Sequence, residues 1–113
     1  MIKKWISEAL EYSNGTHSVD DVLDAINKGE MQLFANKGGC AVTTISQYPQ
    51  KKVCFVFLVG GDLDSVLSIQ PEVEKFAKSK DCEVLSMIGR LGWKKALKSN
   101  GWSSDSICMT RVL

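Results

Sequence analysis

Basic side chains gather around a tryptophan in the stretch 89–102 and form the first candidate binding surface of the chain. The set is Arg90, Lys94, Lys95 and Lys98. Lys94 directly follows Trp93, and Lys98 lies one helical turn after Lys94. Cations beside an aromatic ring can hold the acidic surface of a partner protein or the phosphates of a nucleic acid. A solvated helix face explains the same lysines equally well, and Trp93 is more typical of a core residue.

A second candidate site, Gly60, Gly61 and Asp62, follows the most apolar segment of the chain. Backbone N–H groups of a glycine-containing loop at the start of a helix can cradle a pyrophosphate. Asp62 and Asp64 place negative charge where the phosphates would lie, and like charge weakens the binding of an anion. Both aspartates are better explained as helix N-terminal residues, which the helix dipole favours without any ligand. We therefore expect no cofactor, and these three residues form its site only if one is bound.

The spacing of the cysteines and of the histidine does not match a metal site or a catalytic pair. The cysteines are Cys40, Cys54, Cys82 and Cys108, each within an expected strand and none in a C-x-x-C pair. Structural zinc needs clustered ligands, and the single histidine, His17, lies near the other end of the chain. Without a visible secretion signal, such thiols usually stay reduced and serve as small core residues. We expect neither a metal site nor a catalytic residue here.

Composition indicates the class of protein. With 113 residues, 44% of them hydrophobic and 24% charged, the sequence predicts one globular domain over 1–113. A net charge of +1 argues against a protein that coats nucleic acid. The longest apolar run, Val53–Val59, is far too short to cross a bilayer, and the N-terminal residues lack the apolar region of a signal peptide. We expect a cytoplasmic protein without membrane contact.

The elements that must position these residues begin with two helices. Apolar side chains at helical spacing predict a helix over 2–13. A second helix is expected after Ser18, which forms a capping box with Asp21, and Lys28-Gly29 is typical of its end.

The next stretch changes to the alternation of β-strands. Residues 31–35, a glycine turn and the Val- and Thr-rich residues 40–47 predict a hairpin. The continuous apolar stretch 52–59 predicts a third antiparallel strand, buried on both faces at the centre of the sheet.

The rest of the chain alternates between helix and strand. Residues 63–67 predict a helical turn or two, and Pro71 is expected at the first position of the following helix. A strand over 82–88, a helix over 91–99 and a closing strand over 106–112 complete the order α-α-β-β-β-α-β-α-β. This order predicts an α/β (α+β) domain with one mixed, mostly antiparallel sheet flanked by helices.

This order resembles the fold of the GNAT (Gcn5-related N-acetyltransferase) family over nearly the whole chain. Within that fold, the chain is similar to small GNAT-like proteins encoded by bacteriophages. In that group a Gly-Arg-x-Gly-Trp turn opens the last helix, and a Gly-aromatic pair closes it. Here the turn is 89–93 and the pair is Gly101-Trp102. Gly60-Gly61, the stretch 71–77 and Asp81-Cys82 also resemble that group.

The resemblance implies two tests of acetyl transfer. GNAT enzymes hold acetyl-CoA with a loop of the pattern Arg/Gln-x-x-Gly-x-Gly/Ala after the central strand. The corresponding stretch 60–65 has early glycines and neither Arg nor Gln. Many GNAT enzymes also carry a tyrosine four residues before the Gly-aromatic pair, as the acid that protonates the departing thiolate. That position is Leu97, and a proton-transfer group of this kind contributes about 10²–10⁴-fold.

Both departures favour a GNAT-like protein that has lost acetyl transfer and acts through protein contacts. By resemblance to the phage group, its partner is a virion component, in head assembly or inside the virion, and its location the cytoplasm of an infected host cell or the virion. One alternative is a divergent acetyl-CoA-dependent N-acetyltransferase that uses the amides after Gly60. Another is a small host-directed inhibitor acting through the basic C-terminal face. The partner and the oligomeric state stay open.

Overall fold

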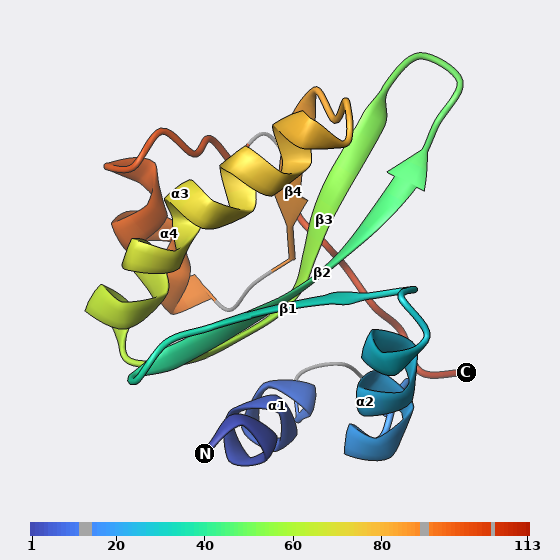
Figure 1. Ribbon diagram of the computed structural model, residues 1–113, viewed down its shortest axis with the longest axis vertical. Coiled ribbons are helices and arrows are strands. Elements are labelled where there is room, and N and C mark those ends of the chain that lie inside the picture. Colours follow the sequence, from blue (N-terminus) through green and yellow to red (C-terminus); the bar gives the residue numbers. More distant parts are fainter. Residues whose placement is uncertain (12–14, 89–90, 105) are drawn as a thin grey trace.

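Figure 1 shows the computed structural model, which describes residues 1–11, 15–88, 91–104 and 106–113. Within them the sheet has four strands in the order β1-β2-β3-β4. Strands β1, β2 and β3 are antiparallel neighbours, and β4 runs parallel to β3. The elements are α1 (Ile2–Leu10), α2 (Val19–Asn27), β1 (Gln32–Ala35), β2 (Gly39–Gln47), β3 (Lys52–Gly61), α3 (Leu63–Ser79), β4 (Val84–Met87) and α4 (Leu91–Lys98).

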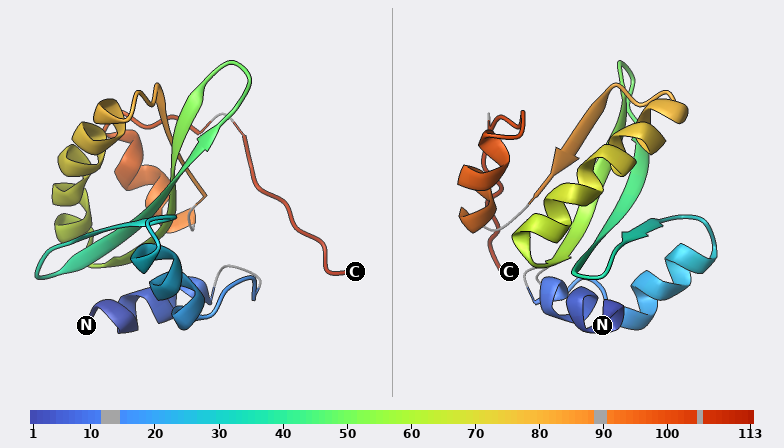
Figure 2. Two further views of the ribbon diagram at one scale, coloured as in Figure 1. Left: turned by 45° about the vertical axis from the view of Figure 1, so that its right-hand side comes forward. Right: turned by 60° about the vertical axis from the view of Figure 1, so that its left-hand side comes forward.

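The two N-terminal helices cover one face of the sheet because each carries an apolar stripe at helical spacing (Figure 2). α2 begins as predicted. Ser18 Oγ accepts a hydrogen bond from Asp21 N at 3.1 Å, and Asp21 Oδ2 accepts one from Ser18 N at 2.9 Å. α1 ends at Leu10, and the remainder of the expected helix lies largely outside the described residues. The core on this face consists of Trp5, Ile6, Leu10, Val22, Cys40, Val42 and Leu58.

The opposite face of the sheet is covered by α3, with α4 beside it (Figure 1). The core on this side consists of Ala41, Cys54, Val56, Ile69, Val73 and Ala77. β3 therefore contributes buried side chains to both faces, as its continuous apolar sequence predicted.

A β-bulge at Phe57 changes which face the side chains of β3 meet. Val42 pairs with Leu58 and Thr43 pairs with Val56, so Phe57 is the extra residue in the ladder. Cys54 and Val56 consequently pack under α3, whereas Leu58 packs under α1. The parallel ladder between β3 and β4 ends just before the bulge, at Val56 and Met87. Beyond that point β3 continues to Gly61 with no β4 partner among the described residues.

Pro71 corrects the expected helix start. It lies inside α3 rather than at its first position, and the helix is continuous from Leu63 to Ser79. The missing N–H of proline removes one helical hydrogen bond, to the carbonyl of Leu67. Buried side chains on both sides of Pro71, including Ile69 and Val73, hold the two halves against the same face of the sheet. Tertiary contacts therefore outweigh the local cost of the proline.

The expected closing strand is wrong. Residues 106–113 carry no strand, and β4 itself is shorter than the predicted 82–88. The side chains of Ile107, Met109 and Val112 are 80%, 81% and 92% exposed. An alternating apolar sequence gives a segment the capacity to pair, but a strand forms only where a sheet edge accepts its backbone groups. Cys108 is accordingly exposed and not a core residue.

Candidate functional site

Four glycines bring α1, the β1–β2 turn and the end of β3 into close contact. A Cβ atom on Gly60 would lie 2.7 Å from Trp5 Cβ and 2.9 Å from the Trp5 carbonyl oxygen, so α1 rests directly on the strand. Gly61 has φ of +107° and faces the backbone of Gly38 and Gly39, where a side chain has no room. We call these residues, Gly38, Gly39, Gly60 and Gly61, the glycine corner.

The side chain of Asn36 links the glycine corner to α3 through hydrogen bonds. Its Oδ1 accepts hydrogen bonds from the amides of Gly38 and Gly39 at 3.0 and 2.9 Å. Its Nδ2 donates to the carbonyl of Ser65 and to the hydroxyl of Ser68, each at 2.9 Å. Sequence reasoning missed this role. An asparagine just before a Lys-Gly-Gly turn was the available signal, because Asn side chains commonly bond to backbone amides in turns.

Asp62 alone connects β3 to α3 and caps the helix. Its Oδ1 accepts a hydrogen bond from Ser65 N at 2.8 Å, and its Oδ2 accepts one from Ser65 Oγ at 3.0 Å. The backbone hydrogen bond from Ser65 lowers the pKa of Asp62 below its ordinary value, and the Ser65 hydroxyl adds to this effect. Asp64 lies in the first turn. Both aspartates thus occupy the helix N-terminal positions that the sequence predicted for them.

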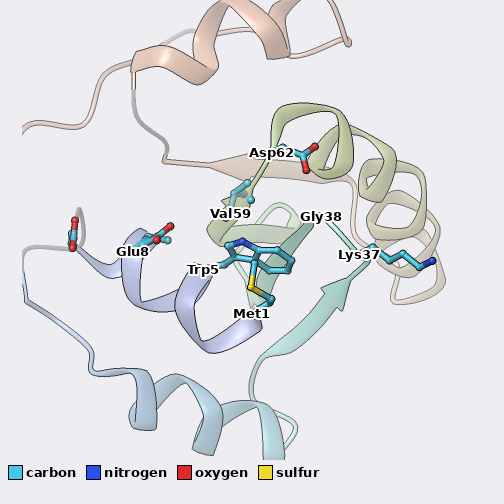
Figure 3. Close-up of a pocket in the computed structure, with 11 residues that line it drawn as sticks. Met1, Trp5, Glu8, Lys37, Gly38, Val59 and Asp62 are labelled. Atoms are coloured by element: carbon cyan, nitrogen blue, oxygen red, sulfur yellow. The ribbon is translucent and has the colours of Figure 1, made fainter.

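An open cleft of about 730 Å³ lies between α1 and the glycine corner (Figure 3). We call it the α1 cleft. It is lined by Met1, Trp5, Glu8, Ala9, Glu11, Lys37, Gly38, Val59, Gly60, Gly61 and Asp62. Three lining side chains are carboxylates and one is a lysine, and Figure 3 shows Lys37 extending away from Trp5. The predicted cofactor residues Gly60, Gly61 and Asp62 therefore share a cleft with two glutamates that sequence reasoning did not assign to it.

The predicted basic surface lies on α4, on the other side of the sheet. Lys94, Lys95 and Lys98 are exposed, and Arg90 lies outside the described residues. Trp93 and Leu97 are half-buried and line a narrow apolar cavity of about 40 Å³, so Trp93 is only partly the core residue that its type suggested. The cavity is also lined by Trp102, Leu85, Met87 and the inner side of α3. A volume of this size is close to that of one water molecule.

Neither the thiols nor the histidine line the α1 cleft or the cavity beside α4. All four cysteines are free, and burial raises the pKa of Cys40 to about 11. His17 packs edge-on against Phe57 with ring centroids 4.9 Å apart, and its Nδ1 lies 2.8 Å from Thr16 Oγ1. Among the described residues, no three His, Cys, Asp or Glu side chains are placed to hold a metal ion. Nor does any helix in the described ranges have the length and apolar character of a membrane span.

Comparisons with known proteins give the fold. No protein-family model matches the sequence, and no curated protein matches it. Among solved structures, an acetyltransferase from Trypanosoma brucei superposes with a TM-score of 0.70 at 12% identity, over 99% of this chain and 92% of that one. Glucosamine-6-phosphate N-acetyltransferase from Arabidopsis thaliana gives 0.69 at 15% identity, over 93% and 86%.

A third similar structure is an aminoglycoside acetyltransferase from an uncultured soil sample, in complex with sisomicin. Its TM-score is 0.68 at 12% identity, over 99% of this chain and 87% of that one. These neighbours and the mixed four-stranded sheet with its flanking helices establish a GNAT-like acetyltransferase fold. Identities this low establish the fold alone.

Proposed function

We propose that this chain is a non-catalytic protein of the GNAT-like fold, which acts by binding another protein. The observation that supports this most is the capping of α3 by Asp62. In the fold's enzymes, by resemblance, amides at this helix start receive the pyrophosphate of acetyl-CoA. Here the Asp62 carboxylate already accepts the hydrogen bond of Ser65 N. An anion would have to displace a negatively charged group that is held at two points.

The length of the connection also fits a pyrophosphate poorly. β3 ends at Gly61 and α3 begins at Leu63, so one residue stands where a loop would wrap around phosphates. Gly61 is closed in by the backbone of Gly38 and Gly39. The glycines that resemble a phosphate loop are therefore accounted for by close backbone contact.

The position of the general acid supports the same proposal. Leu97 occupies the place where many enzymes of the family carry a tyrosine, and it faces an apolar cavity. A leucine has no proton to donate to a departing thiolate.

Calorimetry with acetyl-CoA tests the proposal. We expect no measurable binding at millimolar ligand, which corresponds to a binding free energy weaker than about −4 kcal/mol. Asp62→Arg is the informative variant, because it replaces the blocking carboxylate by a cation. If charge alone blocks the site, this variant gains detectable affinity. A micromolar dissociation constant for the unmodified protein would overturn the proposal.

A divergent N-acetyltransferase is the second candidate, favoured by one observation. β3 and β4 part after Val56 and Met87, at the bulge of Phe57, so the end of β3 has no β4 partner. An acyl-CoA could use backbone groups of this strand end without the usual basic residue. The same calorimetry separates the two candidates, and transfer of acetyl groups to an amine would decide for the enzyme.

The proposed setting is a bacteriophage virion. The similarity of 89–102 to small phage-encoded GNAT-like proteins supports a role in head assembly or as an internal virion component. In that setting Lys94, Lys95 and Lys98 form the proposed partner surface, and their exposure is compatible with it. Genes for portal, scaffold or tail proteins beside its own gene would support this setting, whereas a metabolic gene cluster would contradict it.

A further inference from the structure

The α1 cleft is more acidic than the rest of the molecule. Glu8 and Glu11 lie along α1 and just after its end, and Asp62 lies across the cleft. The net charge of the whole chain is +1, so this local excess of carboxylates is a property of the cleft. Lys37 is the one basic side chain in the lining, and it extends away from the indole in Figure 3. Such a cleft attracts cationic groups.

Trp5 supplies an independent sign of a ligand. Its side chain is only 7% exposed, yet it lines the cleft. Within the described residues its indole Nε1–H makes no hydrogen bond, whereas every fully enclosed side-chain nitrogen has a partner. The Nε1–H therefore opens onto the cleft, and Figure 3 shows the nitrogen on the side of Val59, away from Met1. A mostly buried indole N–H usually finds an acceptor.

Together, the acidic lining and the unpaired indole N–H favour one class of ligand. The indole N–H requires an acceptor such as a carbonyl oxygen, whereas the carboxylates and the aromatic face favour a cation. A peptide with lysine or arginine provides both. A polyamine has cations but no acceptor, and a nucleic acid would meet like charge. The volume of about 730 Å³ is within the usual range of about 300–1,000 Å³ for a ligand pocket.

We propose that the α1 cleft binds a basic segment of a partner protein. A lysine or arginine side chain of that segment lies between Glu8, Glu11 and the indole of Trp5, and a backbone carbonyl of the same segment accepts the Trp5 Nε1–H hydrogen bond. This site goes beyond the function proposed above, because it is separate from the α4 lysines. It rests on that function in one respect: Gly60, Gly61 and Asp62 also line the cleft, so acetyl-CoA must not occupy it.

Calorimetry of the full chain with a defined peptide tests the inference. The probe is an acetylated, amidated hexapeptide of alternating glycine and lysine, and its neutral match carries glutamine in place of lysine. We expect saturable binding of the lysine peptide that weakens with salt. Glu8→Lys together with Glu11→Lys should lower the affinity by about tenfold or more, because two attractions become repulsions. Trp5→Phe should lower it by about three- to tenfold.

A matched control distinguishes peptide binding in the α1 cleft from a general effect of the net charge of the protein. Glu72→Lys with Glu74→Lys changes the charge equally on the exposed side of α3 and should leave the affinity within about twofold. Equal losses in the two charge variants, or no binding at millimolar peptide, would overturn the inference. Spermine binding as tightly as the peptide would overturn the peptide assignment. If Trp5→Phe fails to fold, the charge variants still decide.

Discussion

At the residue scale, Asp62 couples the start of α3 to pH. Its pKa is lowered from the ordinary 3.8 by the Ser65 hydrogen bonds. A group with a depressed pKa stabilises the folded state above its unfolded pKa, and that stability is lost as pH falls through the folded pKa. Asp62→Asn keeps an oxygen acceptor but removes the charge. We expect the variant to be less stable at about pH 6, and the difference in stability to shrink as the pH falls towards about 2.

Urea unfolding at the two pH values checks this expectation. Asp62 is fully exposed, so the effect should be modest and reduced by salt. A stability difference that stays constant from about pH 6 to about pH 2 would show that the charge of Asp62 does not matter to the cap.

Gly60 is the residue that lets α1 rest on β3. Gly60→Ala places a Cβ atom 2.7 Å from Trp5 Cβ, and overpacking of this kind costs about 1–3 kcal/mol. We expect lower stability and a red-shifted emission from Trp5 as α1 moves away. Gly29→Ala is the control, because Gly29 has φ of +79° and open space around it. That variant should lose about 1–2 kcal/mol of stability through backbone strain, with the emission unchanged.

At the element scale, α4 has a partly exposed core side and a solvated outer side. Trp93 is half-buried over the narrow apolar cavity, so Trp93→Ala should cost about 1–3 kcal/mol, less than the 3–5 kcal/mol typical of a buried tryptophan. Lys94, Lys95 and Lys98 changed together to serine should alter stability by about 0.5 kcal/mol or less. Chemical denaturation measures both. A large loss in the triple variant would assign those lysines a structural role.

The segment 106–113 provides a second test at this scale. Because Ile107, Met109 and Val112 are at least 80% exposed, deletion of 106–113 should change the free energy of unfolding by about 0.5 kcal/mol or less. Thermal unfolding of the shortened and the full chain gives the answer. A strongly destabilised short chain would mean that this segment pairs with the sheet in solution, as its alternating sequence predicts.

At the scale of the whole molecule, one sheet joins two cores through the shared strand β3. Cys40 lies in the core under α1, and Cys54 lies in the core under α3. Both thiols are buried and have raised pKa values, whereas Cys108 is exposed. A thiol reagent at neutral pH should therefore label Cys108 quickly and Cys40 and Cys54 only when the molecule unfolds. Mass spectrometry after brief labelling checks this order.

If the two cores unfold together, Cys40 and Cys54 should become reactive at the same denaturant concentration. Separate midpoints would instead show that the α1 side and the α3 side open independently.

Most of the local elements and the fold class could be predicted from the amino-acid sequence alone. Helix caps and strand alternation are local properties of the chain, so a few neighbouring residues are enough to predict them. Examples are the spacing of the apolar residues, the Ser18–Asp21 capping box and the aspartates after Gly61. The order of elements was enough to indicate a GNAT-like fold. For the same reason the helix role of Asp62 could be predicted before the strand beside it was placed.

Tertiary structure alone decided the rest. The bulge at Phe57, the continuity of α3 through Pro71 and the unpaired state of 106–113 depend on partners distant in the sequence. The α1 cleft likewise joins Glu8 to Asp62, which no local spacing relates. Trp5 could be predicted as a core residue, but its exposed indole nitrogen could not, because burial of an atom is set by what packs across from it.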